Sequence, residues 1–111
     1  MREAKKILII SSDRSLSDVL KFCFDGWGYE VIVSEDPVSD ISPIKKASPD
    51  VIVVDVHSAN AQQLEVCRLL KDDFLTAFIP VITLINKRQL RSHLLYIKQG
   101  VDDYACVSRW R

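Results

Sequence analysis

The sequence is poor in glycine and has no excess of either charge. Its 3 glycines, Gly26, Gly28 and Gly100, all follow stretches with helical periodicity rather than strands. The phosphate-binding loop of a nucleotide-dependent enzyme needs glycines between a strand and a helix, so this pattern disfavours that class. Lys and Arg (15) balance Asp and Glu (15). A nucleic-acid-binding domain normally carries a basic excess, and the balance argues against one.

Long apolar runs and paired cysteines are also missing. No run approaches the roughly 20 apolar residues of a membrane-spanning helix, and the N-terminal run is too short for a secretory signal. Cys23, Cys67 and Cys106 are odd in number and far apart, without the spacing of a disulfide framework or a structural zinc site. We therefore expect buried, reduced thiols in a cytoplasmic protein.

Short apolar runs alternate with helical periodicity along the whole chain. Runs rich in β-branched residues predict strands, and apolar residues that recur every three or four positions predict helices. The expected strands are residues 7–10, 29–33, 51–56, 79–85 and 101–107, and the expected helices are residues 16–24, 38–47, 61–71 and 90–97. Pro43 shortens the second helix to one that begins at Ser42-Pro43. The alternation predicts one α/β domain with a doubly wound parallel sheet.

Asp55 ends the apolar run Val51-Ile52-Val53-Val54, which predicts a strand covered on both faces. A buried strand has no structural use for an acid. Open parallel sheets hold their ligands and chemistry at the carboxyl ends of their strands, so Asp55 is the first candidate for a functional side chain. The alternative is that Asp55 caps the segment that follows it.

Six segments match one family in order and spacing. They are Ile7-Leu8-Ile9-Ile10 with its polar turn, Gly28-Tyr29-Glu30-Val31, Pro49 to Asp55, Leu64 to Lys71, Ile79-Pro80-Val81-Ile82 and Gly100-Val101-Asp102-Asp103-Tyr104. Over nearly its whole length the chain resembles the receiver domain of two-component response regulators. The resemblance implies a flavodoxin-like fold with five strands in the order 2-1-3-4-5. It also implies that Asp55 stands where the family accepts a phosphoryl group from a histidine kinase or a small phosphodonor.

Most other functional positions of the family are changed here. The resemblance implies two acids after the first strand that hold Mg²⁺, but Ser11 and Ser12 occupy their places. Ile85 stands where a Thr or Ser after the fourth strand would bind the phosphoryl oxygens, and Val107 replaces the Lys after the fifth. Tyr104 keeps the aromatic switch position. With no acid pair, we expect no bound metal.

Three nearby side chains are alternative ligands. Asp13 could replace the acid pair by a shift of one residue, but strand alternation points it away from Asp55. Arg109 could replace the lost Lys, and His57 follows Asp55 by two positions. We expect none of the three to bind phosphate or metal.

The resemblance also implies a last helix after the fifth strand, which this chain lacks. We expect residues 1–111 to be the N-terminal part of a longer protein. In the alternative, another subunit covers the open sheet face, as in a homodimer.

The sequence thus favours a signalling domain of a phosphorelay over an enzyme. We expect it to act through protein–protein contact without phosphorylation, with a histidine kinase or an output domain as its partner. The expected surface surrounds the fourth helix and fifth strand, with Arg88, Arg91 and Tyr104. One alternative is a working receiver that is phosphorylated on Asp55 with low efficiency. A more distant one is a flavodoxin-like nucleotide-binding enzyme. We expect neither nucleic acid nor membrane as a partner.

Overall fold

Five parallel strands form the sheet in a computed structural model of the chain, which describes residues 4–34, 40–55, 61–86 and 102–106. The strands are β1 (Lys6–Ile10), β2 (Glu30–Ser34), β3 (Val51–Asp55), β4 (Val81–Ile85) and β5 (Asp103–Cys106). Their order is β2-β1-β3-β4-β5, and every neighbouring pair is parallel. This confirms the predicted flavodoxin-like sheet.

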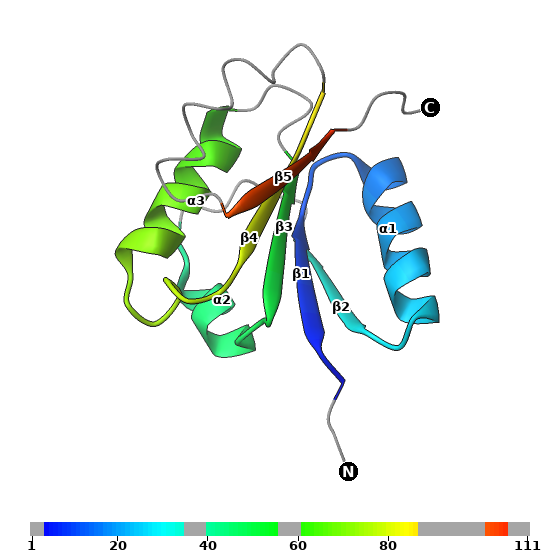
Figure 1. Ribbon diagram of the computed structural model, residues 1–111, viewed down its shortest axis with the longest axis horizontal. Helices are drawn as coiled ribbons and strands as arrows, with labels where there is room; N and C mark the ends of the chain where they lie inside the picture. Colours follow the sequence, from blue (N-terminus) through cyan, green and yellow to red (C-terminus); the bar gives the residue numbers. More distant parts are fainter. Residues whose placement is uncertain (1–3, 35–39, 56–60, 87–101, 107–111) are drawn as a thin grey trace.

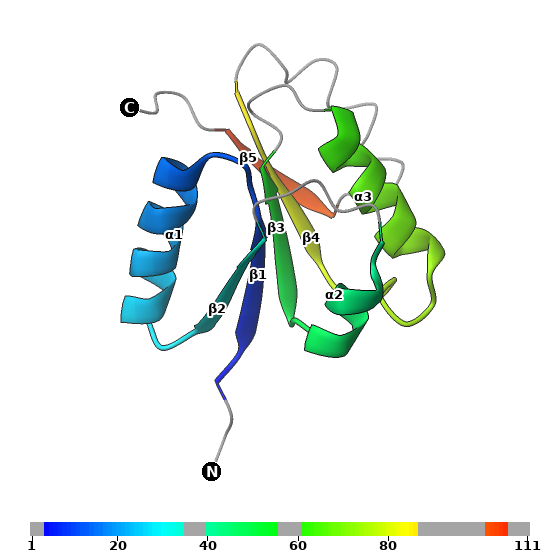
Figure 2. The ribbon, with the colours of Figure 1, turned by 180° about the vertical axis from the view of Figure 1, so that it is seen from behind.

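Within the described residues, three helices cover the sheet: α1 (Arg14–Gly26), α2 (Ser42–Ala47) and α3 (Ala61–Asp72). Figures 1 and 2 show α1 on one side of the sheet and α2 and α3 on the other. The short α2 begins as predicted, with Pro43 in its first turn, where the missing N–H of proline costs nothing. The predicted helix at 90–97 lies outside the described residues.

The core has two parts because side chains alternate between the two faces of each strand. On the α3 face, strand residues pack with α2 and α3; this cluster comprises Leu8, Ile10, Ile44, Ile52, Val54, Val66, Cys67, Leu70, Val81 and Ile85. On the α1 face, the smaller cluster comprises Ile7, Ile9, Leu16, Val53 and Leu84. Among the described residues, the larger cluster of buried apolar side chains therefore lies on the α3 face.

The turn from β1 into α1 is closed by a side-chain cap. Asp13 has an extended backbone, and its Oδ1 accepts a hydrogen bond from the N–H of Leu16 at 3.1 Å. The cap satisfies one of the free N–H groups of the first helical turn. At the other end, Gly28 has a φ of +92°, a conformation that glycine adopts without strain. It turns the chain from α1 into β2.

The strand predicted at 79–85 begins two residues later than expected, at Val81. The N–H of Ile79 donates to the carbonyl of Thr76 within a turn, at 3.0 Å, and Pro80 has no N–H to donate. The carbonyl of Pro80 still accepts from Ile52 N, at 2.9 Å. A proline can thus extend the ladder as an acceptor without belonging to the strand. The other described strand ends lie within two residues of the prediction, and those at Ile10, Val51 and Ile85 match it.

Lys71 ties α3 to the starts of β4 and β5. Its Nζ donates to the carbonyls of Ala77 and Ile79, at 3.1 and 2.9 Å, and lies 2.7 Å from Asp102 Oδ2. The same Oδ2 accepts from the N–H of Val81 at 2.7 Å. Burial opposes ionisation of Asp102, but the bonds from Lys71 and Val81 outweigh it and lower the pKa of the carboxyl group. The cluster fixes where β5 begins.

No helix among the described residues has the length and apolar content to span a bilayer. Cys67 is buried, as predicted, and burial raises the pKa of its thiol to about 12. It is therefore an inert core residue at neutral pH. Cys23 is partly buried.

Candidate functional site

Asp55 lies at the carboxyl end of the central strand, and its exposed fraction is 1%. The register pairs Ile10 of β1 with Val54 of β3. The residues that follow them along the chain, Ser11 and Asp55, therefore stand side by side. Strand alternation points both side chains to the α1 face. The register therefore brings Ser11 to the candidate phosphate acceptor.

Ser11 is fully buried and donates a hydrogen bond from its Oγ to Oδ2 of Asp55 at 2.7 Å. The same Oγ accepts from the N–H of Asp13 at 3.1 Å and lies 3.3 Å from the Asp13 carbonyl. A hydroxyl has one proton to donate. Ser11 donates it to the Asp55 carboxylate, which is the closer and charged acceptor. Ser11 thus joins the β1–α1 turn to Asp55.

Ser12 and Asp13 contribute differently to the site. Ser12 is exposed beside the turn. Asp13 directs Oδ1 to the helical N–H of Leu16, as described above, which is the ordinary use of an acid at this position. The structure therefore brings Ser11 to Asp55 and gives Asp13 the role of a helix cap.

Ile85 and Tyr104 lie on the other face of the sheet. Ile85 ends β4 and is fully buried in the α3-side cluster, against which the partly buried Tyr104 also packs. Tyr104 pairs in register with Thr83, two residues before Ile85, so side chains 83, 85 and 104 share one face. The place of the family's hydroxyl is filled by an apolar side chain within the core.

Several expected site residues lie outside the described residues. They are His57, Arg88, Arg91, Val107 and Arg109. The structure says nothing of how these side chains relate to Asp55, and their roles stay predictions.

The donors around Asp55 do not match a magnesium site. Mg²⁺ prefers carboxylates and other hard oxygens in octahedral geometry. Within the described part of the chain, no group of three His, Cys, Asp or Glu side chains could hold a metal ion. Asp55 brings one carboxylate, and the hydroxyl beside it already donates to that carboxylate. A metal would have to displace this bond and would gain from the pair only one carboxylate and one neutral oxygen ligand.

We accordingly expect Mg²⁺ to bind weakly. Isothermal titration calorimetry of the protein with MgCl₂ should show no saturation below about 1 mM, because tighter binding needs several carboxylates. The matched variant carries Ser11→Asp and Ser12→Asp, which restore the acid pair, and should bind more tightly. Equal affinities for both proteins, or saturation of the parent at micromolar Mg²⁺, would contradict this prediction.

The sequence-based reasoning missed the role of Ser11 as a partner of Asp55. It considered the hydroxyl only as a poor metal ligand. The contact follows from the strand register: β1 pairs Ile10 with Val54 of β3, which places residues 11 and 55 together. Lys71 was missed as well, because nothing local in the sequence links it with Asp102.

Response regulators are the relatives that the sequence matches. The alkaline phosphatase synthesis transcriptional regulatory protein PhoP of Bacillus subtilis is 30% identical over 100 residues, which cover 90% of this chain and 41% of that protein. The DNA-binding response regulator MtrA of Mycobacterium tuberculosis is 26% identical over 100 residues, with 42% of that protein covered. The chain spans about two fifths of the length of these relatives. No family model matches the sequence.

Solved receiver structures share the fold. A chemotaxis response regulator of Vibrio cholerae superposes with a TM-score of 0.83 at 19% identity, over 95% of this chain and 88% of that chain. A receiver domain of a Pseudomonas aeruginosa sensor histidine kinase, solved with a magnesium ion in its active-site cleft, gives 0.81 at 16% identity over 97% and 88%. These likenesses show the fold alone. Together with the matching segments, the response-regulator relatives identify the chain as a receiver domain of the two-component response-regulator type.

Proposed function

We propose that this receiver domain works as a signalling module through protein–protein contact that does not depend on phosphorylation. The observation that carries the proposal is the hydrogen bond from Ser11 Oγ to Asp55 Oδ2 at 2.7 Å. It satisfies a buried carboxylate from within the fold, at the position where the family's acids would otherwise bind a metal. A cytoplasmic location and a histidine kinase or output domain as partner remain parts of this proposal.

Electrostatics support the part of the proposal that the domain does not depend on phosphorylation. Transfer of a phosphoryl group to a carboxylate brings two anions together, and catalysis depends on fixed positive charge or hydrogen-bond donors near them. One such donor beside Asp55 is the hydroxyl of Ser11, and its proton already lies toward the carboxylate. The apolar side chain of Ile85 adds no donor.

Packing supports the part of the proposal that the domain acts through a contact surface that does not switch. In a switching receiver, the hydroxyl after the fourth strand moves toward the phosphoryl group and the aromatic side chain turns inward behind it. Here Ile85 fills the core, and Tyr104 packs against the same cluster. A branched side chain is stiff, so we infer one conformation for the surface around Tyr104.

The proposal predicts that β5 does not respond to a phosphoryl analogue. In ¹H–¹⁵N NMR spectra, beryllofluoride with Mg²⁺ should leave the amide signal of Tyr104 unchanged, because neither the acceptor site nor the side chain behind it can respond. Asp55→Asn is the matched control. A shift at Tyr104 in the parent protein that disappears in Asp55→Asn would overturn the proposal.

That outcome would favour the second candidate, a working receiver of low efficiency. One observation keeps it under consideration: Asp55 lies at the carboxyl end of the central strand, where the family's acceptor lies. A nucleotide-binding enzyme has less support, because the turn that follows β1 is Ser11-Ser12-Asp13 and contains no glycine.

A further inference from the structure

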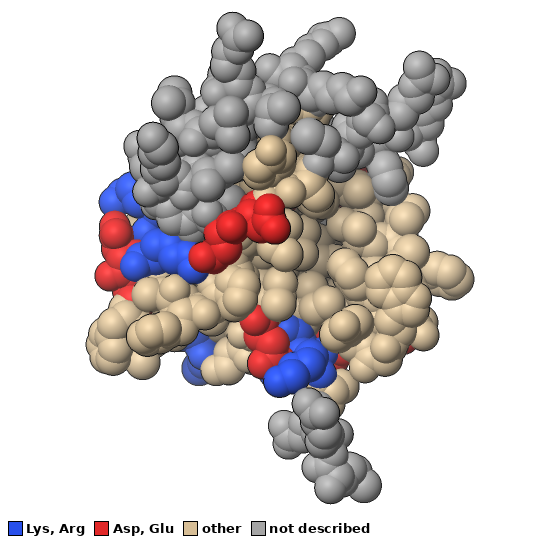
Figure 3. All heavy atoms as spheres, viewed as in Figure 1, with Lys and Arg blue, Asp and Glu red and all other residues tan. Residues whose placement is uncertain are grey.

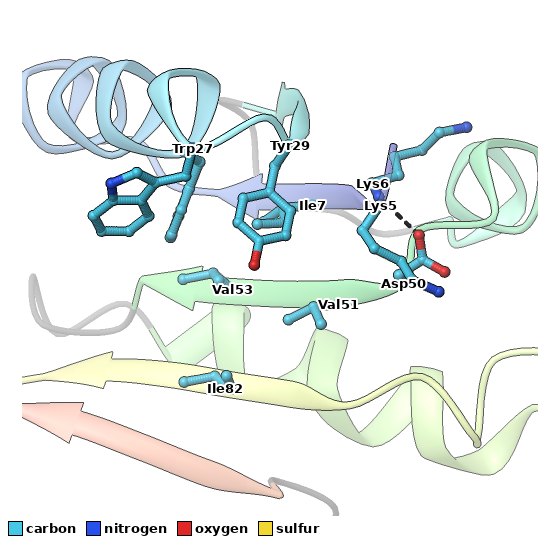
Figure 4. Close-up of a pocket in the computed structure, with 10 residues that line it drawn as sticks. Lys5, Lys6, Ile7, Trp27, Tyr29, Asp50, Val51, Val53 and Ile82 are labelled. Atoms are coloured by element: carbon cyan, nitrogen blue, oxygen red, sulfur yellow. Dashed lines mark hydrogen bonds between the residues drawn. The ribbon is translucent and has the colours of Figure 1, made fainter. Parts of the chain in front are cut away.

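Two aspartates close the starts of two strand pairs in the same way. Asp50 precedes β3, donates its N–H to the carbonyl of Lys6 in β1 at 2.8 Å, and accepts the N–H of Lys6 on Oδ2 at 2.7 Å (Figure 4). Asp102 precedes β5 and makes the same two bonds with Val81 of β4, at 2.9 and 2.7 Å. We call this arrangement an aspartate clamp. It fixes the register at which the strand begins, because a slip of one residue, about 3.3 Å, would break both bonds.

The clamp of Asp102 differs from that of Asp50 by an ammonium group. Lys71 Nζ lies 2.7 Å from Asp102 Oδ2. It also donates to the carbonyls of Ala77 and Ile79, so all three of its N–H groups have an oxygen partner. Figure 3 shows acidic and basic atoms side by side where α3 meets the start of β5. Among the described residues, Asp50 has no such ion pair. An aspartate clamp thus forms without a lysine, and what Lys71 adds is a link to another part of the fold.

The linked part is the turn between α3 and β4, residues 73–80. Its Thr76 is fully buried, and the hydroxyl donates to the carbonyl of Leu70 in α3 at 2.6 Å. The carbonyl of Thr76 accepts from the N–H of Ile79 at 3.0 Å. These bonds fix the turn on α3 and hold the carbonyls of Ala77 and Ile79 where Lys71 binds them. Lys71 therefore joins a fixed turn to the start of β5.

The start of β5 determines where Tyr104 lies. β5 has 4 residues and, among the described strands, pairs only with β4. Its register places Tyr104 beside Thr83, two residues beyond Asp102, and Tyr104 packs against the α3-side cluster. An edge strand is bonded on one side only, so few other bonds hold its register. The clamp of Asp102 is thus the nearest fixed point for the surface around Tyr104.

We propose that Lys71 is a positioning residue for the surface around Tyr104: through Asp102 it holds β5 in register on β4 and makes that register depend on the α3–β4 turn. This role rests on the proposed function, because it specifies what holds the contact surface in one place. A shift of the turn moves the two carbonyls that bind Lys71, and the ammonium group moves Asp102 with them. Loss of Lys71 should leave a weaker clamp that no longer responds to the turn.

Amide hydrogen exchange of the 111-residue protein, measured by NMR, tests this role. In Lys71→Met, the amides of β5 should exchange at least about tenfold faster, because a hydrogen bond between charged groups is lost. The amides of β1 report opening of the whole sheet and should change less. Lys45→Met is the matched control. Lys45 pairs with Asp73 at the start of the same turn, at 2.5 Å, and this pair does not involve β5. Exchange in β5 should then stay within about twofold of the parent.

A second substitution tests the dependence on the turn. Thr76→Val removes the hydroxyl that ties the turn to α3. It should speed exchange in β5 of the parent and add nothing in Lys71→Met, because coupled sites are not additive. If Lys71→Met does not fold, Asp102→Asn takes its place in both measurements, since the amide keeps an oxygen acceptor for Val81 but carries no charge.

Three results would show that Lys71 does not position β5. They are equal changes of exchange in β1 and β5, equal effects of Lys45→Met and Lys71→Met, and additive effects of Thr76→Val and Lys71→Met. None of these measurements uses a phosphoryl analogue. The role of Lys71 and the proposed function can therefore fail independently.

Discussion

Incubation with acetyl phosphate and Mg²⁺ should leave Asp55 unmodified. Three groups that the family uses are changed: Ser11 and Ser12 replace the acids, Ile85 replaces the hydroxyl and Val107 replaces the Lys. Loss of one preorganised electrostatic contact costs on the order of 10²-fold in rate. Since such losses do not add simply, we expect a combined loss of roughly 10⁴-fold or more. Intact-mass spectrometry should show no species about 80 Da heavier, the mass of one phosphoryl group.

A variant that restores the family's side chains is the matched control for this prediction. The variant with Ser11→Asp, Ser12→Asp and Ile85→Thr returns three of the four changed positions to the family's residues. It should acquire a heavier species that disappears when Asp55→Asn is added. Stoichiometric modification of the parent, lost in its own Asp55→Asn variant, would show that the hydrogen bond from Ser11 does not protect the carboxylate.

The parallel α/β fold was predictable because it depends on properties that are local in sequence, whereas the strand order 2-1-3-4-5 came from the resemblance to receiver domains. Five runs of β-branched residues alternate with helical periodicity, and short right-handed connections leave few arrangements. Pro43 fixed the start of α2 because a proline without an N–H fits only the first helical turn. The start of β4 was predicted too early for a related reason. Pro80 supplies only an acceptor to the ladder, a feature that apolar periodicity does not reveal.

Only part of the candidate site could be predicted. The position of Asp55 followed from the strand that it ends. The bond from Ser11 required the exact pairing of β1 with β3, which joins residues 44 positions apart. The contact of Lys71 with Asp102 also spans two elements and depends on where the intervening turn places the chain. Such contacts depend on tertiary structure rather than on local pattern.

The largest effect on stability should come from truncation of Ile85. Its side chain is fully buried in the α3-side cluster, and removal of a buried isoleucine side chain costs about 2–5 kcal/mol because a cavity remains. Ile85→Ala should therefore lower the free energy of unfolding by this amount in urea denaturation. Phe78→Ala, at an 89% exposed residue of the same chain, should change it by no more than about 0.5 kcal/mol. Equal losses in both variants would contradict the assigned packing.

Ile85→Val then separates stability from conformational freedom at Tyr104. Loss of one methyl group should cost only about 0.5–1.5 kcal/mol, so the protein stays folded. If Ile85 fixes the ring of Tyr104, the space created should add ring conformations. The NMR signals of Tyr104 should then shift or broaden more than those of residues on the α1 face. Unchanged Tyr104 signals in a folded Ile85→Val protein would mean that other members of the cluster hold the ring, and that Ile85 is an ordinary core residue.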